Sequence, residues 1–333
     1  MVKISKVLGN FFRTQSSGVK RSFTVPCSFR ASTTTPRYLI AAIVAVSLQS
    51  SWLKADEAPA TIVTVNGTAI TESDLEFLYL SRDVRDDLRA SIRDRYIEQL
   101  INRHLLKEFL SSRKIKAPES IVKERVERTE KLITREGLNF DETLKNLGYT
   151  RASFAEEVAL PLAWRTHARL AITDKAIVAY WKTHRSKFDG TEVRAAHIVK
   201  RLPKDASDEA RKTLPQTLSK LRQSIVDQKT SFAEAASEHS DSPSGKDGGD
   251  LGQFAFRGRM PQALTSVAFA LKTGEVSEPF ESPFGVHILT VTEIIPGDLS
   301  LEDARGEIFQ ELSAKLQTGL IKQLRDKAEI NRP

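Results

Sequence analysis

Three segments decide the predicted fold: EVRAAHIVKR (192–201), HSDSPSGKDGGDLGQF (239–254) and FGVHILTVTE (284–293). The first and last of these segments are rich in β-branched and apolar residues, which is typical of strands. Each predicted strand, Val193–Val199 and Val286–Thr292, carries one histidine inside an apolar pattern, His197 and His287. A strand does not need an imidazole to pack, so the pair indicates a site. The alternative is two unrelated core histidines.

Between the two strands the sequence predicts helices and a glycine-rich turn. Leu214, Leu218, Leu221 and Ile225 repeat at helical spacing, and Pro261 fits the first position of a short helix. The order of strand, three helices and strand favours helices packed around one small sheet, which places residues 190–296 in the α+β class.

The flanking sequence predicts a mainly helical body. Residues 58–189 begin with a hairpin, Thr61–Val65 and Thr68–Ile70 around an Asn-Gly turn, and continue into amphipathic helices. Residues 297–333 predict one more amphipathic helix, which needs a partner to be stable in water. We expect it to pack on the N-terminal helical domain, so that the central domain is an insertion.

The net charge of +7 is concentrated at the N-terminus. Eight of the 50 Lys and Arg residues, and none of the 43 Asp and Glu residues, lie in residues 1–55. The remainder has a net charge of −1, so no basic face for nucleic acid is expected. The single cysteine, Cys27, excludes an intramolecular disulfide.

Residues 1–57 resemble a targeting segment. A basic leader precedes the apolar run YLIAAIVAVSL (38–48), which extends with weaker character to residue 53. This run is shorter than the ~20 residues of a membrane span and fits a secretory signal. An uncleaved anchor through residues 38–53 is the alternative, with a transit peptide or a buried helix as further options. The sequence therefore predicts an extracytoplasmic location, in the periplasm or cell envelope.

The central stretch resembles the parvulin-type (PpiC, or rotamase) peptidyl-prolyl cis-trans isomerases over about 100 residues. The flanking helices, with VNGTAIT (65–71) near their start, resemble the two-part helical domain of SurA- and PrsA-type extracytoplasmic foldases. The motifs that carry the first resemblance are AAHIV (195–199), FAEAASEHSDSPSGKDGGDLGQF (232–254), GRM (258–260), AFALKTGEVSEP (268–279) and FGVHILTV (284–291).

The resemblance implies an isomerase that rotates X-Pro peptide bonds without a cofactor, a metal or a covalent step. Amide resonance sets a barrier of ~18–20 kcal/mol, and a thousandfold acceleration needs only ~4 kcal/mol of differential stabilisation. In the family, two histidines fix the hydrogen-bond network under the substrate carbonyl, and His197 and His287 match them. We expect them to orient and tune the site, with Ser282 joining the same network.

The implied proline pocket departs from the family at two places. Met260 and Phe254 match its apolar residues, but Leu264 stands where a second Phe is usual. Ser242, preceded by Asp241, stands where the family usually has Cys or Asp. A hydroxyl is a poor anion at neutral pH, so Asp241 is a candidate to take over that role if the loop rotates.

The predicted function is a prolyl isomerase and folding factor for exported proteins. Its partners would be unfolded or partly folded polypeptides that contain X-Pro, with no phosphoserine requirement because acidic residues offset Lys200 and Arg201. The alternative is a peptide-binding chaperone whose parvulin-like domain has weak or no activity, which Ser242 and Leu264 would favour.

Overall fold

The computed structural model describes residues 60–202 and 207–332. The predicted leader, its apolar run and Cys27 lie outside these residues. The chain divides into a helical unit, Met1–Ala168 with Gln317–Pro333, and a sheet unit, Arg169–Leu316. The division falls inside two helices, so the domain boundaries expected at residues 189/190 and 296/297 stay a prediction. In the described ranges no helix is long and apolar enough to cross a bilayer.

The helical unit begins with the predicted hairpin of β1 (Thr61–Val65) and β2 (Thr68–Thr71). Asn66 and Gly67 turn the chain with φ of 49° and 80°, the left-handed conformation that Asn and Gly tolerate best. Thr71 then caps α2 in a complete capping box with Asp74. The helices of this unit are α2 (Glu72–Ser81), α3 (Asp86–Ser112), α4 (Glu119–Arg135), α5 (Phe140–Asn146), most of α6 (Arg151–Ala171) and the second half of α11 (Leu301–Arg325).

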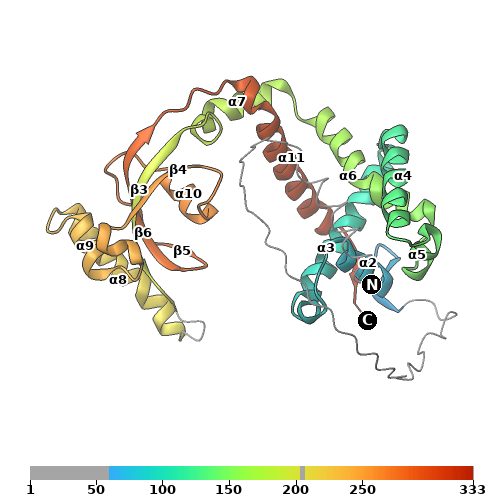
Figure 1. The fold of residues 1–333 in the computed structure, drawn as a ribbon, viewed down its shortest axis with the longest axis horizontal. Coiled ribbons are helices and arrows are strands. Elements are labelled where there is room, and N and C mark those ends of the chain that lie inside the picture. The colour runs from blue at the N-terminus through green and yellow to red at the C-terminus, as the bar shows by residue number, and fades with distance from the viewer. Residues whose placement is uncertain (1–59, 203–206, 333) are drawn as a thin grey trace, which may run out of the picture. The chain divides into compact units, whose positions relative to one another are not determined.

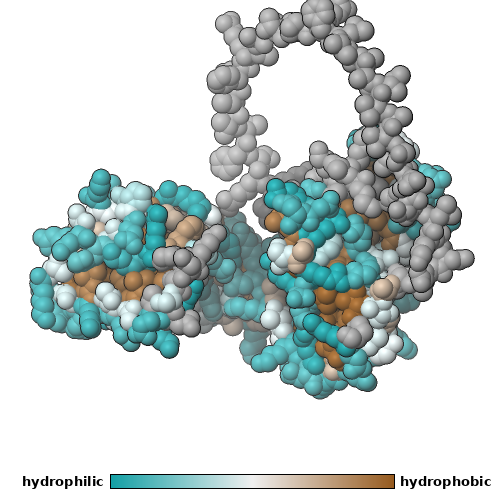
Figure 2. Space-filling model, turned by 90° about the horizontal axis from the view of Figure 1, so that it is seen from below, coloured by the Kyte–Doolittle hydropathy of each residue, from teal (hydrophilic) through white to brown (hydrophobic). Residues whose placement is uncertain are grey.

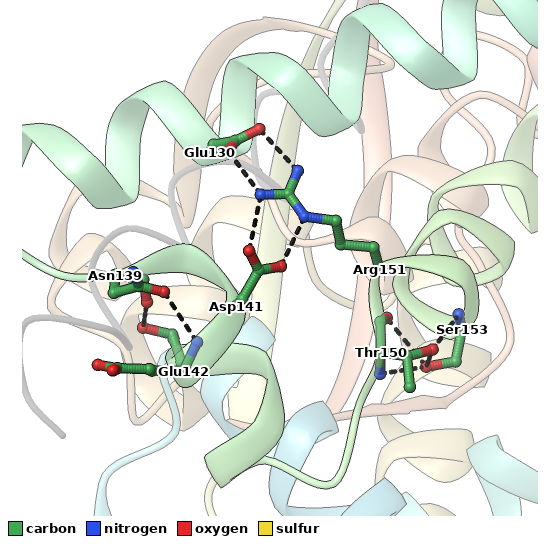
Figure 3. Close-up of polar contacts among 8 residues, drawn as sticks. Glu130, Asn139, Asp141, Glu142, Thr150, Arg151 and Ser153 are labelled. Carbon is green, nitrogen blue, oxygen red and sulfur yellow. Dashed lines mark hydrogen bonds and ion pairs between the residues drawn. The ribbon is translucent and has the colours of Figure 1, made fainter.

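Helices α4, α5 and α6 are joined by one arginine. Arg151, at the start of α6, donates to both Glu130 of α4 and Asp141 of α5 (Figure 3). Its guanidinium also lies over the Phe140 ring at 4.8 Å. Beneath these contacts Phe140 packs with Phe154 in a buried cluster, so the arginine closes a small aromatic core.

The second half of α11 packs on the first sheet of this unit. Leu324 and Ile330 lie against the cluster that contains Val63, Val65 and Ile101. The helix predicted in residues 297–333 does not extend to their end, because α11 stops at Arg325 and β7 (Ile330–Asn331) pairs with β1. The side of β1 that does not face β2 supplies main-chain hydrogen-bond partners for β7, and Ile330 is partly buried against the adjoining cluster. The resulting order is β2-β1-β7, with β2 at an edge.

The sheet unit is built on one antiparallel sheet of order β4-β3-β6-β5. Two of its strands were predicted; β4 and β5 were not, because Gly252 interrupts the first and the second is only three residues long. Its elements are α7 (Asp174–His184), η1 (Arg185–Lys187), β3 (Glu192–Lys200), α8 (Asp208–Val226), α9 (Phe232–His239), η2 (Pro243–Asp247), β4 (Asp250–Ala255), α10 (Gln262–Ala268), β5 (Phe280–Ser282), β6 (Gly285–Ile295) and the first half of α11.

Helices cover both faces of this sheet (Figure 1). On one face Ile198 and Ile288 pack with residues of α8 and α9. On the other, Val193, Leu289 and Ala268 form a cluster with α10. Because side chains alternate along a strand, His197 and His287 belong to the α10 face. The predicted α+β class is confirmed.

Candidate active site

The two predicted histidines meet on neighbouring strands. In the β3–β6 register Val199 lies opposite His287, so the two imidazoles project from the same face two residues apart. Their Nδ1 atoms are 3.3 Å apart, and the ring planes are inclined by 30°. Both side chains are buried, with 7% of His197 and 1% of His287 accessible. Such a contact requires one nitrogen to donate and the other to accept.

Residues of β5 hold the far side of His287. The hydroxyl of Ser282 lies 2.7 Å from His287 Nε2, and it also accepts the N–H of Phe284 at 3.0 Å. Phe280, two residues before Ser282, stacks on the His287 ring at 5.4 Å with an interplanar angle of 18°. The chain of contacts Ser282–His287–His197 therefore fixes both rings, as the resemblance implied for Ser282.

Burial keeps both imidazoles neutral. It lowers the pKa of His197, and burial together with the neighbouring His197 lowers the pKa of His287 to about 4. Charging either ring would place a cation in an apolar site with no carboxylate among its hydrogen-bond partners. At neutral pH each ring therefore carries a single proton.

With one proton on each ring, two arrangements satisfy the Nδ1 contact. In the first, Ser282 donates to His287 Nε2, His287 Nδ1–H donates to His197, and His197 carries its proton on Nε2. In the second, every bond is reversed and His197 Nε2 is a bare acceptor. In both arrangements His197 Nε2 is the end of the network, and it is the only atom of the network with no partner within the described residues.

The apolar residues of the predicted pocket lie on the same face. Phe254 of β4 is buried and clusters with Leu289 and Ala268, and Met260 packs against that cluster. Leu264 is buried on α10 with 3% of its surface accessible. Phe280 belongs to the same cluster, so it joins the aromatic wall to the histidine pair. The sequence did not reveal it because β5, with three residues, is too short to show a strand pattern.

The polar loop between α9 and η2 is held to the end of β3. Asp241 N–H donates to Val199 O at 2.8 Å, and its carboxylate accepts from Lys200 Nζ at 3.0 Å and Arg201 N–H at 2.8 Å. Partial burial opposes ionisation, but these two partners lower the pKa of Asp241. The Ser242 hydroxyl instead contacts Ser244 Oγ at 3.0 Å. No hydrogen bond links either residue to His197 in the part of the chain that the structure describes.

The glycine turn after this loop sets the position of His197. His197 N–H donates to Gly249 O at 2.9 Å. Gly249 has φ of 82°, and a Cβ there would lie 2.3 Å from His197 O. Asp250 accepts from Gly252 N–H at 3.0 Å and pairs with Arg194 at 2.7 Å. These residues shape the turn and fit it against the histidine strand.

No cluster of three His, Cys, Asp or Glu side chains within the described residues has the arrangement of a metal site. The site offers hydrogen bonds and an apolar wall. Such a site is suited to holding an uncharged group in a strained geometry.

Comparison with known families identifies the class. Residues 197–293 match the family of the rotamase, PPIC-type PPIase domain. They form a parvulin-type peptidyl-prolyl isomerase domain, and this match supports isomerase activity.

The surrounding chain is similar to foldases. The foldase protein PrsA of Halalkalibacterium halodurans is 29% identical over 282 residues, 81% of this chain and 76% of that protein. PrsA of Bacillus subtilis (strain 168) is 33% identical over 147 residues, but the match spans only 44% of each protein. A crystal structure of the peptidylprolyl isomerase PrsA from Bacillus anthracis covers 69% of this chain and 96% of its own, at 23% identity and a TM-score of 0.43.

Proposed function

We propose that this protein catalyses X-Pro rotation in unfolded or partly folded exported polypeptides and so assists their folding. The observation that carries the proposal is the Ser282–His287–His197 network beside the apolar cluster of Phe254 and Met260, inside a rotamase domain. The similarity to PrsA foldases over most of the chain supports the folding role.

In the proposed mechanism the apolar wall holds the proline ring and excludes water. Rotation breaks amide conjugation, so the carbonyl oxygen loses negative charge and the lone pair becomes localised on the nitrogen. With its proton on Nε2, His197 donates to that oxygen, while Ser282 and His287 keep the ring from turning. Since both rings are neutral, the step needs no proton transfer. The hydrogen bond from His197 holds the carbonyl in place, and the dry apolar pocket favours the twisted amide because it is less polar than the planar form.

The experiment that tests the isomerase is a proline-limited refolding assay with the full chain and its His197→Ala and His287→Ala variants. We expect each variant to lose most of the rate enhancement while its circular dichroism spectrum is unchanged. Equal catalysis by parent and variants would refute the histidine roles.

Ser242 and Asp241 require a separate test. We propose that Ser242 leaves the site less polar than in the usual family pattern, because its hydroxyl is turned to Ser244. Ser242→Asp and Ser242→Cys should then raise kcat severalfold. Asp241→Asn should change kcat little, since its oxygens serve Lys200 and Arg201. A selective loss in Asp241→Asn would show that Asp241 acts on the substrate.

The location outside the cytoplasm is also a proposal. It is supported by the basic residues and the apolar run at positions 38–48, which fit a signal, and residues 38–53 are the candidate tether if the segment is retained. N-terminal sequencing of protein from a fractionated cell distinguishes a cleaved signal from a retained tether. A full-length chain in the cytosolic fraction would contradict both.

A chaperone without useful turnover is the second candidate, and the comparisons favour the isomerase over it. Ser242 and Leu264 are the residues in its favour. Aggregation suppression that persists in the His197→Ala, His287→Ala double variant would show that the holding activity is separate from catalysis.

A further inference from the structure

The helical unit contains a cavity that the isomerase does not use. Its volume is about 850 Å³, within the ~300–1,000 Å³ typical of ligand pockets. It is lined by β2, α2 and α3, and by residues of the α5–α6 region such as Tyr149 and Leu160. Figure 2 shows hydrophobic surface between hydrophilic rims on this unit, which lies to the right in the view.

Part of the cavity wall is apolar and aromatic. Phe77 stacks on Tyr149 with ring centroids 4.3 Å apart, and both line the cavity together with Tyr96 and Leu100. The Tyr149 hydroxyl donates to Asp74 at 3.1 Å, so its polar end is already bonded. The wall therefore accommodates aliphatic or aromatic side chains.

The charged side chains of the lining offer no strong attraction to an ion. Three are acidic and three basic: Asp74, Glu108 and Glu157 against Arg82, Arg103 and Lys107. Most of them have partners inside the protein. Arg103 pairs with Glu157, Lys107 Nζ lies 2.6 Å from Glu156, and Glu108 accepts from Asn66 at 2.6 Å. An uncharged ligand is favoured.

One rim of the cavity is the free edge of a sheet. β2 is an edge strand, and Thr68, Ala69 and Ile70 all line the cavity. The tight turn makes Val65 and Thr68 a hydrogen-bonded pair, so Thr64 and Ala69 form the next, non-hydrogen-bonded pair. The N–H and C=O of Ala69 consequently point away from β1. Ala69 is exposed, and no backbone hydrogen bond joins it to another element of the described chain.

We propose that this cavity binds an extended, uncharged polypeptide segment, which adds to β2 as a further strand. Ala69 supplies one donor and one acceptor to the main chain of the segment, and the aromatic cavity receives its alternate side chains. A small apolar molecule would use the cavity but not Ala69. The site lies in a different unit from the histidine pair and needs no proline.

The proposal rests on the proposed function only in taking an unfolded polypeptide as the ligand. The direct test uses a fluorescein-labelled, eight-residue peptide of alternating Val, Thr and Phe without proline, and measures fluorescence anisotropy with the full chain. Ala69→Pro removes the outward N–H of residue 69 but leaves the hydrogen bonds between β1 and β2 intact. Ala69→Val is the matched control, because it keeps this N–H. We expect Kd to rise at least tenfold, or ~1.4 kcal/mol, in Ala69→Pro and to change less than twofold in Ala69→Val.

A second measurement does not depend on folding of the variant. The same peptide, N-methylated at alternate residues, cannot pair with an edge strand and should bind the parent at least tenfold more weakly. Isomerase turnover of Ala69→Pro should match the parent, which separates failure of this site from failure of the proposed function.

Three results would overturn the proposal. Equal binding of the methylated and unmethylated peptides would exclude strand addition. Displacement of the probe by an Ala-Pro substrate peptide, with no effect of Ala69→Pro, would place binding at the isomerase site. A dimer of the parent that Ala69→Pro converts to a monomer would assign the edge to a second copy of the chain.

Discussion

Arg257 donates to Glu311 Oε2 at 2.7 Å, and so links the loop that carries Met260 to helix α11. The same guanidinium contacts Glu307 at 3.2 Å and lies 4.5 Å over the Phe188 ring. A second arginine, Arg259, donates to Leu251 O and Gln253 O of β4. The loop before Met260 is therefore fixed from two sides.

We predict that Arg257→Ala raises KM for an X-Pro peptide about two- to fivefold with a smaller change in kcat, because exposed ion pairs contribute up to ~1 kcal/mol. Steady-state kinetics with a proline peptide measures this. Arg305→Ala is the matched control, since Arg305 of α11 pairs with Asp174 of α7 and with Glu302 of α11 but not with the loop. Equal effects of the two substitutions would contradict a positioning role for Arg257.

The acid sensitivity of the site follows from the lowered pKa of His287. Its folded pKa of about 4 lies below the ordinary value of 6.5, so the unfolded chain binds a proton that the folded chain does not. Stability from this group is complete above pH 6.5 and is lost as pH falls toward 4. We expect the drop in Tm between pH 7.5 and 5.0 to be smaller in His287→Gln than in the parent.

His239→Gln is the control for that measurement, because His239 lies on α9 with 41% of its side chain accessible. It should leave the drop in Tm unchanged. Isomerase activity should be flat from pH 7 to 8, because burial holds the pKa of both rings below the ordinary value. A rate that follows a group with a pKa near 7 would show that a charged histidine takes part.

Ser282 should matter through His287 alone. Ser282→Ala removes the hydroxyl 2.7 Å from His287 Nε2, which frees the ring and leaves a buried nitrogen unpaired. We predict that kcat falls roughly tenfold while KM stays within twofold. Ser282→Thr keeps the hydroxyl and should restore most of the rate. Failure of the threonine variant would indicate that Ser282 acts on the turn instead.

Replacing Gly249 is predicted to be costly for both the fold and the site. Alanine there would set a Cβ 2.3 Å from His197 O in a left-handed backbone conformation. Gly249→Ala should lower Tm and also reduce activity by displacing His197. Gly319→Ala is the contrast, because nothing lies within 4 Å of its Cβ position inside α11. It should stabilise the chain by up to ~1 kcal/mol, and thermal denaturation distinguishes the two.

Much of the site was predictable because its signals are local. Asn66-Gly67 identified the hairpin, and one histidine in each strand identified the sheet face on which the two imidazoles meet. Strand β4 escaped prediction because Gly252 breaks its alternation, and β7 because its partner β1 lies far away in the sequence.

The partners of the polar loop also escaped prediction. Whether Asp241 faces the histidines or Lys200 depends on tertiary packing at the end of β3, and the same holds for the unpartnered Nε2 of His197. The spacing of residues in the sequence carries no information on which partner each of these groups will have.

The pairing of β7 with β1 has a consequence for the order of folding during synthesis. Thr64 and Asn331, which pair across this sheet, are 267 residues apart. The sheet of the helical unit therefore cannot be completed until residues 330–331 have emerged, whereas the sheet unit is one continuous segment that emerges earlier. Closing so long a loop is slow and is aided when the intervening segment is already compact. The isomerase is thus expected to reach its folded form before the body that surrounds it in the sequence, and a chain stalled short of β7 would still present a finished catalytic unit.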